Sequence, residues 1–146
     1  MPKTLVVYAT RSEKTKEIAH HIAEGIKAAG LEVKVADVKS IKNTSELVGY
    51  DGYAFGSATY HGEMMEAMKT MLFMAEKANL DGKIGGAFGS YGWSGEAPDR
   101  IYQTMQNIFN MKMVNNALRI KSPASLGDAQ LAQAYGREIG QKIKAL

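Results

Sequence analysis

The stretch that most constrains the fold is Leu5-Val6-Val7-Tyr8-Ala9, a short run of apolar, β-prone residues near the start of the chain. A run this short, without polar alternation, is typical of a parallel strand that is buried on both faces. From Ile18 to Ile26 apolar residues recur at helical spacing, and Gly30 then predicts the end of a helix. A buried strand followed directly by an amphipathic helix indicates the start of an α/β protein.

The same alternation of strand and helix continues along the chain. Further strands are predicted over residues 31–35, Tyr50 to Ser57, Lys83 to Gly89 and Val114 to Ile120. Helices are predicted over residues 64–75, 97–110 and 128–144, and a loop with a short helical turn over Asp37 to Leu47. Strands that alternate with helices form right-handed βαβ crossovers, which predicts a parallel sheet of about five strands with helices on both faces. We expect a single domain over residues 1–146.

Composition excludes several classes of site. The chain has no Cys, which excludes a disulfide, a thiolate nucleophile and a cysteine-held iron–sulfur cluster. His20 and His21 are adjacent on a helix and point in different directions, so we expect no His-based metal site. The formal charge of +3 is spread along the chain, which predicts a solvated surface and no nucleic-acid partner. No apolar run approaches the ~20 residues of a membrane span, and Met1-Pro2-Lys3 shows no signal-peptide pattern, so we expect a cytoplasmic location.

The turn between the first strand and the first helix carries three hydroxyl side chains, Thr10, Ser12 and Thr15. At a helix start the first N–H groups have no intrahelical partner, and the helix dipole favours negative charge. Hydroxyl groups add further donors, so the turn suits a phosphate. The alternative is that Thr10 or Ser12 only caps the helix. The Gly-rich spacer of a P-loop and the G-x-G-x-x-G of a dinucleotide fold are both absent.

Two further loops are expected at the carboxyl ends of strands, where open parallel sheets bind their ligands. The loops are Ser57-Ala58-Thr59-Tyr60-His61-Gly62 and Gly89-Ser90-Tyr91-Gly92-Trp93-Ser94-Gly95-Glu96. Tyr60, Tyr91 and Trp93 lie in these loops, and large aromatic residues beside glycines are better suited to the walls of a flat ring than to a core. The Met-rich face of the predicted helix 64–75 is instead expected to pack in the core.

A hydroxyl turn after the first strand, with aromatic loops after the third and fourth, resembles the short-chain flavodoxins. Thr10-Arg11-Ser12-Glu13-Lys14-Thr15 resembles the phosphate loop of that family, with Glu13 in place of a glycine. The segment Gly89 to Glu96 is more similar still to the flavodoxin-like domain of flavodiiron proteins. The resemblance covers nearly the whole chain. It implies a three-layer, doubly wound α/β fold with a five-stranded parallel sheet of order 2-1-3-4-5.

The resemblance also implies non-covalent binding of FMN. The phosphate would be held by Thr10, Ser12, Thr15 and backbone N–H groups, with Arg11, Glu13 and Lys14 beside it. The ribityl chain and flavin edge would lie along Ser57, Ala58 and Thr59. The isoalloxazine would be flanked by Tyr60 and by Trp93 or Tyr91. Backbone would approach the pyrimidine edge at Gly89, Ser90, Gly92 and Gly95, and His61-Gly62 lies where the family's loop adjusts to the reduced flavin. No catalytic residue and no metal ligand are expected, and Glu13 is expected to repel the phosphate unless its side chain turns away.

The implied function is electron transfer, with low-potential electrons shuttled between redox partners by a carrier rather than a stand-alone enzyme. The mildly basic chain predicts an acidic redox partner, such as a ferredoxin or an acidic oxidoreductase. One alternative is an FMN-dependent NAD(P)H:quinone-type oxidoreductase, which shares the fold. Another is a flavin-free interaction domain. A response-regulator receiver is excluded, because the positions of its acidic cluster carry Thr10, Arg11 and Ser57.

Overall fold

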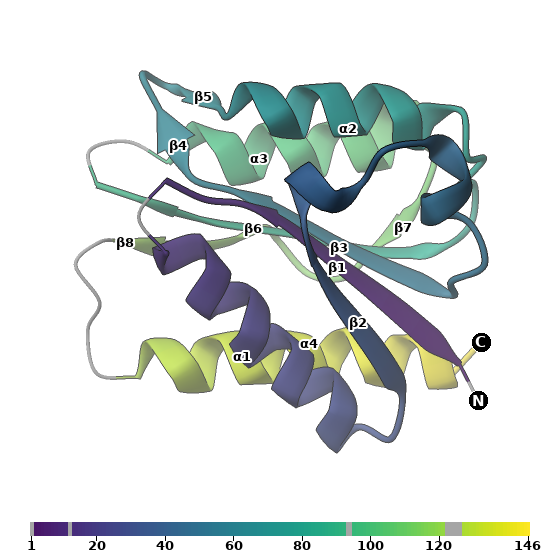
Figure 1. The fold of residues 1–146 in the computed structure, drawn as a ribbon. Coiled ribbons are helices and arrows are strands. Elements are labelled where there is room, and N and C mark those ends of the chain that lie inside the picture. The colour runs from purple at the N-terminus through teal and green to yellow at the C-terminus, as the bar shows by residue number, and fades with distance from the viewer. Residues whose placement is uncertain (1, 12, 93–94, 122–126) are drawn as a thin grey trace.

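A parallel β-sheet lies between two layers of helices in the computed structural model, which describes residues 2–11, 13–92, 95–121 and 127–146 (Figure 1). The helices are α1 Lys14–Ala28, α2 Glu66–Glu76, α3 Glu96–Gln103 and α4 Asp128–Lys144. In Figure 1, α1 and α4 cover one face of the sheet, and α2 and α3 cover the other. The predicted three-layer α/β architecture is confirmed.

The sheet has the predicted strand order. Its strands are β1 Lys3–Ala9, β2 Glu32–Asp37, β3 Gly52–Ser57, β6 Ile84–Tyr91, β7 Lys112–Met113 and β8 Leu118–Lys121. The order is β2-β1-β3-β6, and both β7 and β8 pair with the outer side of β6, all in parallel. The order 2-1-3-4-5 is therefore confirmed, with two short strands sharing the fifth position.

The fifth strand differs from the prediction of one continuous strand from Val114 to Ile120. Strand β7 pairs with β6 up to Gly85, and β8 resumes the pairing only at Phe88. Between the two, Asn115 takes a left-handed conformation (φ 44°), and its side-chain oxygen accepts a hydrogen bond of 2.9 Å from the N–H of Asn116. Asparagine tolerates this backbone conformation, so it makes a turn where the sequence predicts a strand.

The interruption leaves a backbone donor of β6 without a strand partner, and a side chain of α4 takes its place. The N–H of Ala87 donates a hydrogen bond of 3.1 Å to the hydroxyl of Tyr135. Burial raises the pKa of Tyr135, so this phenol stays neutral at physiological pH. A buried N–H without a partner would be costly, and the tyrosine therefore stabilises the sheet at its interruption.

Several other boundaries also differ from the sequence prediction. The third strand begins at Gly52, β6 extends through Tyr91, and the helix predicted over 97–110 is α3 followed by a π-helical segment, η3 Thr104–Ile108. Two 3-10 turns, η1 Val38–Ser40 and η2 Thr44–Leu47, lie where a loop with one short turn is predicted. A small hairpin of β4 Thr59–Tyr60 and β5 Glu63–Met64 lies where a loop is predicted.

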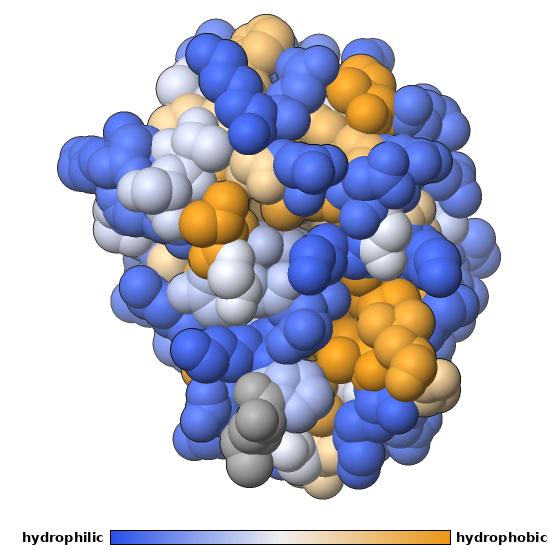
Figure 2. All heavy atoms as spheres, turned by 90° about the vertical axis from the view of Figure 1, so that its right-hand side faces the viewer, coloured by the Kyte–Doolittle hydropathy of each residue, from blue (hydrophilic) through white to orange (hydrophobic). Residues whose placement is uncertain are grey.

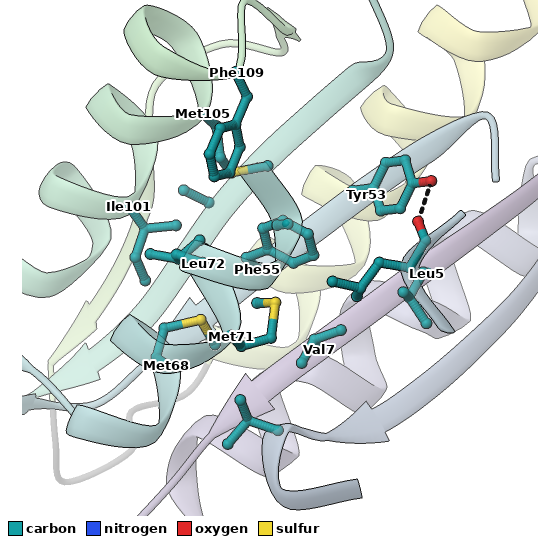
Figure 3. Packing of buried hydrophobic residues seen from close by; sticks show 14 of the residues in the cluster. Leu5, Val7, Tyr53, Phe55, Met68, Met71, Leu72, Ile101, Met105 and Phe109 are labelled. Carbon is teal, nitrogen blue, oxygen red and sulfur yellow. Dashed lines mark hydrogen bonds between the residues drawn. The ribbon is translucent and has the colours of Figure 1, made fainter. Parts of the chain in front are cut away.

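The core between the sheet and α2 and α3 is rich in methionine (Figure 3). Met68, Met71 and Met105 are fully buried around Phe55 of β3, so the Met-rich face is core, as predicted. Tyr53 also lies in this cluster, and its hydroxyl donates a hydrogen bond of 2.6 Å to the carbonyl of Leu47, drawn as the dashed line in Figure 3. Burial raises the pKa of Tyr53 to about 12, which keeps this donor protonated.

On the opposite face, α1 and α4 pack with their backbones in close contact. A Cβ atom added at Gly136 of α4 would lie 2.0 Å from the carbonyl oxygen of Ile22 in α1. A Cβ atom added at Gly25 of α1 would likewise lie 2.0 Å from the carbonyl oxygen of Gln133. Only glycine fits such an approach, so these two positions fix how α1 lies against α4 and beneath the sheet.

The end of the molecule at the amino ends of the strands is mainly hydrophilic, with hydrophobic residues in small, separate areas (Figure 2). Within the described ranges, every helix is too short or too polar to cross a membrane.

Candidate functional site

The carboxyl ends of β1, β3 and β6 meet at one edge of the sheet, on the left in Figure 1. There the N–H of Ala58 donates a hydrogen bond of 3.1 Å to the carbonyl of Ala9, which joins the ends of β3 and β1. The hydroxyls of Thr15 and Ser90 lie 2.7 Å apart and share a buried hydrogen bond. The predicted hydroxyl turn and the two predicted loops are thus neighbours at this edge.

The turn after β1 offers donors to a small anion. The hydroxyl oxygen of Thr10 is buried and has no hydrogen-bond partner among the described residues. The N–H of Glu17 bonds to the carbonyl of Glu13, and among the residues that the structure describes the N–H groups of residues 14–16 have no backbone partner before the helix. Buried polar groups in proteins are normally hydrogen-bonded, so the Thr10 hydroxyl, at this edge of the sheet, is a candidate donor to a ligand. Ser12, the third predicted hydroxyl, lies outside the described residues.

Glu13, which stands where the resemblance implies a glycine, has a backbone conformation that favours glycine. Its φ is 70°, in the left-handed region, and its side chain is 70% exposed. The carboxylate lies 3.6 Å from the ammonium of Lys16. The side chain therefore extends into solvent and its charge is paired, which reduces the repulsion of a phosphate predicted from the sequence.

Replacing Glu13 with glycine is expected to stabilise the FMN-free protein by roughly 0.5 to 1 kcal/mol, because relief of the left-handed strain exceeds the entropic cost of glycine. Urea unfolding of the parent and of E13G measures this difference. E13Q is the matched control: it removes the charge, keeps the strained backbone, and should unfold at the parent's midpoint. A lower midpoint for E13G than for E13Q would contradict the assignment of strain to Glu13.

Lys14 links the starts of two helices. Its ammonium lies 3.4 Å from a carboxylate oxygen of Asp128, the first residue of α4, and the two side chains are only 12% and 14% exposed. An ion pair this far from water is screened less than a surface pair. Lys14 therefore holds α1 and α4 together at the edge that carries the hydroxyl turn. A contact between Lys14 and a cofactor stays a prediction.

The second predicted loop is a tight hairpin. His61 and Gly62 both have positive φ, 50° and 73°, as a two-residue type I′ turn between β4 and β5 requires. The hydroxyl of Ser57 accepts a hydrogen bond of 3.0 Å from the N–H of Met65, and that of Thr59 accepts one of 3.1 Å from the N–H of Ala97. These two hydroxyls attach the hairpin to the starts of α2 and α3.

The hairpin presents one aromatic ring at the edge of the site. Tyr60 is 45% exposed, and the guanidinium carbon of Arg11 lies 3.9 Å from the centroid of its ring. The imidazole of His61 is also close, with ring centroids 4.2 Å apart. An exposed ring at this edge is suited to stack on a flat ligand. The structure thus brings Arg11, from the first turn, against Tyr60. The sequence analysis did not predict this contact.

Strand β6 includes Gly89, where the predicted strand ends, and continues through Ser90 and Tyr91, which were predicted to lie in the loop. Ser90 and Tyr91 are in the strand because they pair with Ile120 and Lys121 of β8. A Cβ atom at Gly89 would lie 2.1 Å from the carbonyl oxygen of Ser57, so glycine is required there for the close approach of β6 to β3.

The residues beyond β6 are less enclosed. Gly92 has open space where a Cβ atom would lie, and a Cβ atom at Gly95 would lie 3.1 Å from the ring of Tyr91. Trp93 and Ser94 lie outside the described residues.

The described residues hold no metal-binding cluster, because they contain no group of three or more His, Asp or Glu that could ligate one ion.

Near the site, burial raises the pKa of Tyr8 in β1, and the carboxylate of Asp37 adds to that rise. This phenol is therefore neutral at physiological pH.

The family model for flavodoxin matches residues 6–135. The chain is 31% identical to the putative diflavin flavoprotein A 2 of Thermosynechococcus vestitus, over 99% of this chain and 25% of that protein. It is 30% identical to the type A flavoprotein fprA of Rhodobacter capsulatus, over 97% of this chain and 33% of that protein. The chain therefore spans a quarter to a third of the length of these relatives.

Solved structures give the same result. A flavodoxin from the domain Archaea superposes with a TM-score of 0.92 at 36% identity, over 97% of this chain and 99% of that one. The flavodiiron core of Flv1 from Synechocystis superposes with a TM-score of 0.91 at 25% identity, over 99% of this chain and 36% of that one. With the family model matching most of its length, the chain belongs to the flavodoxin family of FMN-binding electron-transfer proteins.

Proposed function

We propose that residues 1–146 form a single FMN-binding domain that carries low-potential electrons between redox partners. The observation that carries this proposal is the buried, unpartnered hydroxyl of Thr10 at the start of α1, on the same edge as the exposed ring of Tyr60. A site with anion donors at one part and an exposed aromatic ring at another fits a cofactor with a phosphate tail and a flat ring system. FMN has both, and when bound it supplies the redox chemistry.

Each part of the site has a proposed task. Thr10, Thr15 and the N–H groups of residues 14–16 hold the phosphate, together with Ser12 as predicted from the sequence. Tyr60 stacks on the flavin ring, with Trp93 or Tyr91 as the second aromatic. The close packing of β6 on β3 at Gly89 lets the backbone of β6 approach the cofactor. Ser57 and Thr59 hold the hairpin in place through their bonds to Met65 and Ala97.

The binding test compares FMN with riboflavin, which lacks the phosphate. Fluorescence titration of the FMN-free protein should show quenching of FMN at a Kd at least tenfold lower than that for riboflavin, since hydrogen bonds to a charged group contribute about 1.5 to 3 kcal/mol each. Equal affinity for the two flavins would contradict the proposal that the hydroxyl turn binds the phosphate. Absence of binding to either would leave a flavin-free interaction domain.

The rival function, an NAD(P)H:quinone-type oxidoreductase, is separated by turnover. The FMN-loaded protein should not oxidise NAD(P)H with a quinone unless a partner reductase is added. Rapid turnover by the isolated protein would favour the enzyme.

We also propose that this electron carrier works in the cytoplasm.

The partner is proposed to be acidic, because the chain carries a formal charge of +3. Opposite charges steer encounter, and salt screens them. The rate of electron transfer with an acidic ferredoxin should therefore fall steadily as ionic strength rises from about 0.01 to 0.5 M, where the Debye length falls from about 30 Å to a few ångströms. Stopped-flow absorbance measures this rate. A rate independent of salt would contradict an acidic partner.

A further inference from the structure

Arg11 lies against Tyr60 across two segments of the site. Its guanidinium carbon is 3.9 Å from the centroid of the tyrosine ring, within the range of a cation–π contact. Arg11 follows β1, whereas Tyr60 lies in β4, so the contact joins the hydroxyl turn to the hairpin. Tyr60 is 45% exposed, and its ring is therefore not enclosed by the core.

The charge of Arg11 also differs from those of the other cations in the turn. The ammonium of Lys14 is paired with Asp128, and that of Lys16 is paired with Glu13. Among the residues that the structure describes, Arg11 forms no ion pair with a carboxylate. Its positive charge is therefore not cancelled locally and acts on whatever stacks against Tyr60.

The guanidinium of Arg11 lies over the ring of Tyr60, and the imidazole of His61 lies beside the same ring, with centroids 4.2 Å apart and planes tilted by 50°. We propose that Arg11 covers one face of Tyr60, that the flavin stacks on the opposite face, and that the charge of Arg11, held in place by the ring, favours the reduced cofactor. This inference rests on the proposed function. It makes Arg11 a positioning and charge-setting residue that acts through Tyr60, instead of a phosphate ligand.

The size of the effect follows from the layered geometry. The guanidinium is 3.9 Å from the ring of Tyr60, and stacked rings have centroids about 4.5 Å apart at closest, so the cation lies about 8 Å from the flavin. Fully reduced FMN carries one negative charge more than oxidised FMN. At about 8 Å and an effective dielectric of about 40, one positive charge raises the affinity for the reduced form about sixfold relative to the oxidised form.

The test is a redox titration of FMN-loaded R11Q, R11K and parent protein, combined with the Kd of each for oxidised FMN. R11Q is expected to lose about sixfold in the ratio of reduced to oxidised affinity, seen as a lower potential for uptake of the second electron. R11K should recover part of that loss, since an ammonium can also lie over a tyrosine ring. Lys27→Gln, at the far end of α1, removes the same charge away from the site and should leave the ratio within twofold.

A second background tests whether the ring of Tyr60 holds Arg11 at this distance from the flavin. In Y60L, Arg11 has no aromatic face to cover, and R11Q should then change the ratio by less than twofold. The proposal is overturned if R11Q binds FMN and keeps the parent's ratio, if K27Q shifts the ratio as much as R11Q, or if the full effect persists in Y60L. Failure of the parent itself to bind FMN overturns the proposed function and this inference with it.

Discussion

Replacing Thr10 with valine is expected to weaken FMN binding by about ten- to a hundredfold, because a hydrogen bond to a charged group contributes about 1.5 to 3 kcal/mol. The same variant should leave the FMN-free protein at least as stable as the parent. The Thr10 hydroxyl is buried without a partner among the described residues, so a methyl group in its place breaks no bond of the FMN-free protein. Loss of affinity without loss of stability would show that the Thr10 hydroxyl contributes to binding FMN and not to folding.

Fluorescence titration measures the affinity of T10V, and urea unfolding measures its stability. Riboflavin is the first control, because it has no phosphate and its affinity should not change. Thr4→Val is the matched second control: the Thr4 hydroxyl is also buried and unpartnered within the described residues, but it lies at the opposite end of β1. T4V should therefore be more stable than the parent and bind FMN equally well. Equal losses for FMN and riboflavin in T10V would show that Thr10 does not contact the phosphate.

Replacing Gly136 with alanine is expected to destabilise the protein by about 3 kcal/mol or more, at the upper end of the usual cost of overpacking. The added Cβ atom would lie 2.0 Å from the carbonyl oxygen of Ile22, and a backbone atom cannot turn away as a side chain can. Helices α1 and α4 would have to separate. Alanine improves helix propensity by only about 1 kcal/mol, which does not offset this clash.

Urea unfolding of G136A against the parent measures this effect, with Gln141→Ala as the control at an exposed position of the same helix. Q141A should stay within about 0.5 kcal/mol of the parent. The start of α1 carries the hydroxyl turn, so G136A should also weaken FMN binding. Parent-like stability of G136A would show that the two helices are not in close backbone contact.

The layers and the strand order could be predicted from sequence, because they depend on periodic burial. Helix α4 runs from Asp128 to Lys144, the bounds that its amphipathic pattern predicts. The buried strand β1 was equally clear, since all but one of its residues are buried. In both elements one local pattern decides the structure, and tertiary contacts do not oppose it.

The parts that the sequence did not predict depend on contacts between distant residues. The end of β6 carries glycine, serine and tyrosine, a composition typical of a loop, and it is a strand because β8 pairs with it. The two-residue strands of the β4–β5 hairpin are too short to show any periodicity. The available signal in the sequence was Gly62, since the second position of a type I′ turn favours glycine.

In the site too, local patterns could be predicted from sequence and contacts between distant residues could not. Sequence reasoning placed three segments at one edge, and the structure confirms that they meet. The hydrogen bond between Thr15 and Ser90 joins residues 75 positions apart, and the Lys14–Asp128 pair joins residues 114 positions apart. No local pattern encodes such pairs. The contact of Arg11 with Tyr60 is of the same kind, and only the fold brings it about.

The interruption between β7 and β8 has a consequence for how chain length can vary in this protein. The N–H of Val114 still donates a hydrogen bond of 2.9 Å to the carbonyl of Gly85, and the hydroxyl of Tyr135 serves the N–H of Ala87, so the pairing of β6 does not depend on residues 115–117. Extra residues inserted after Asn115 would lengthen an existing turn without dividing a strand, and a longer surface turn costs little in closure entropy. This point on the rim of the sheet can therefore accept an added segment while the cofactor edge keeps its shape.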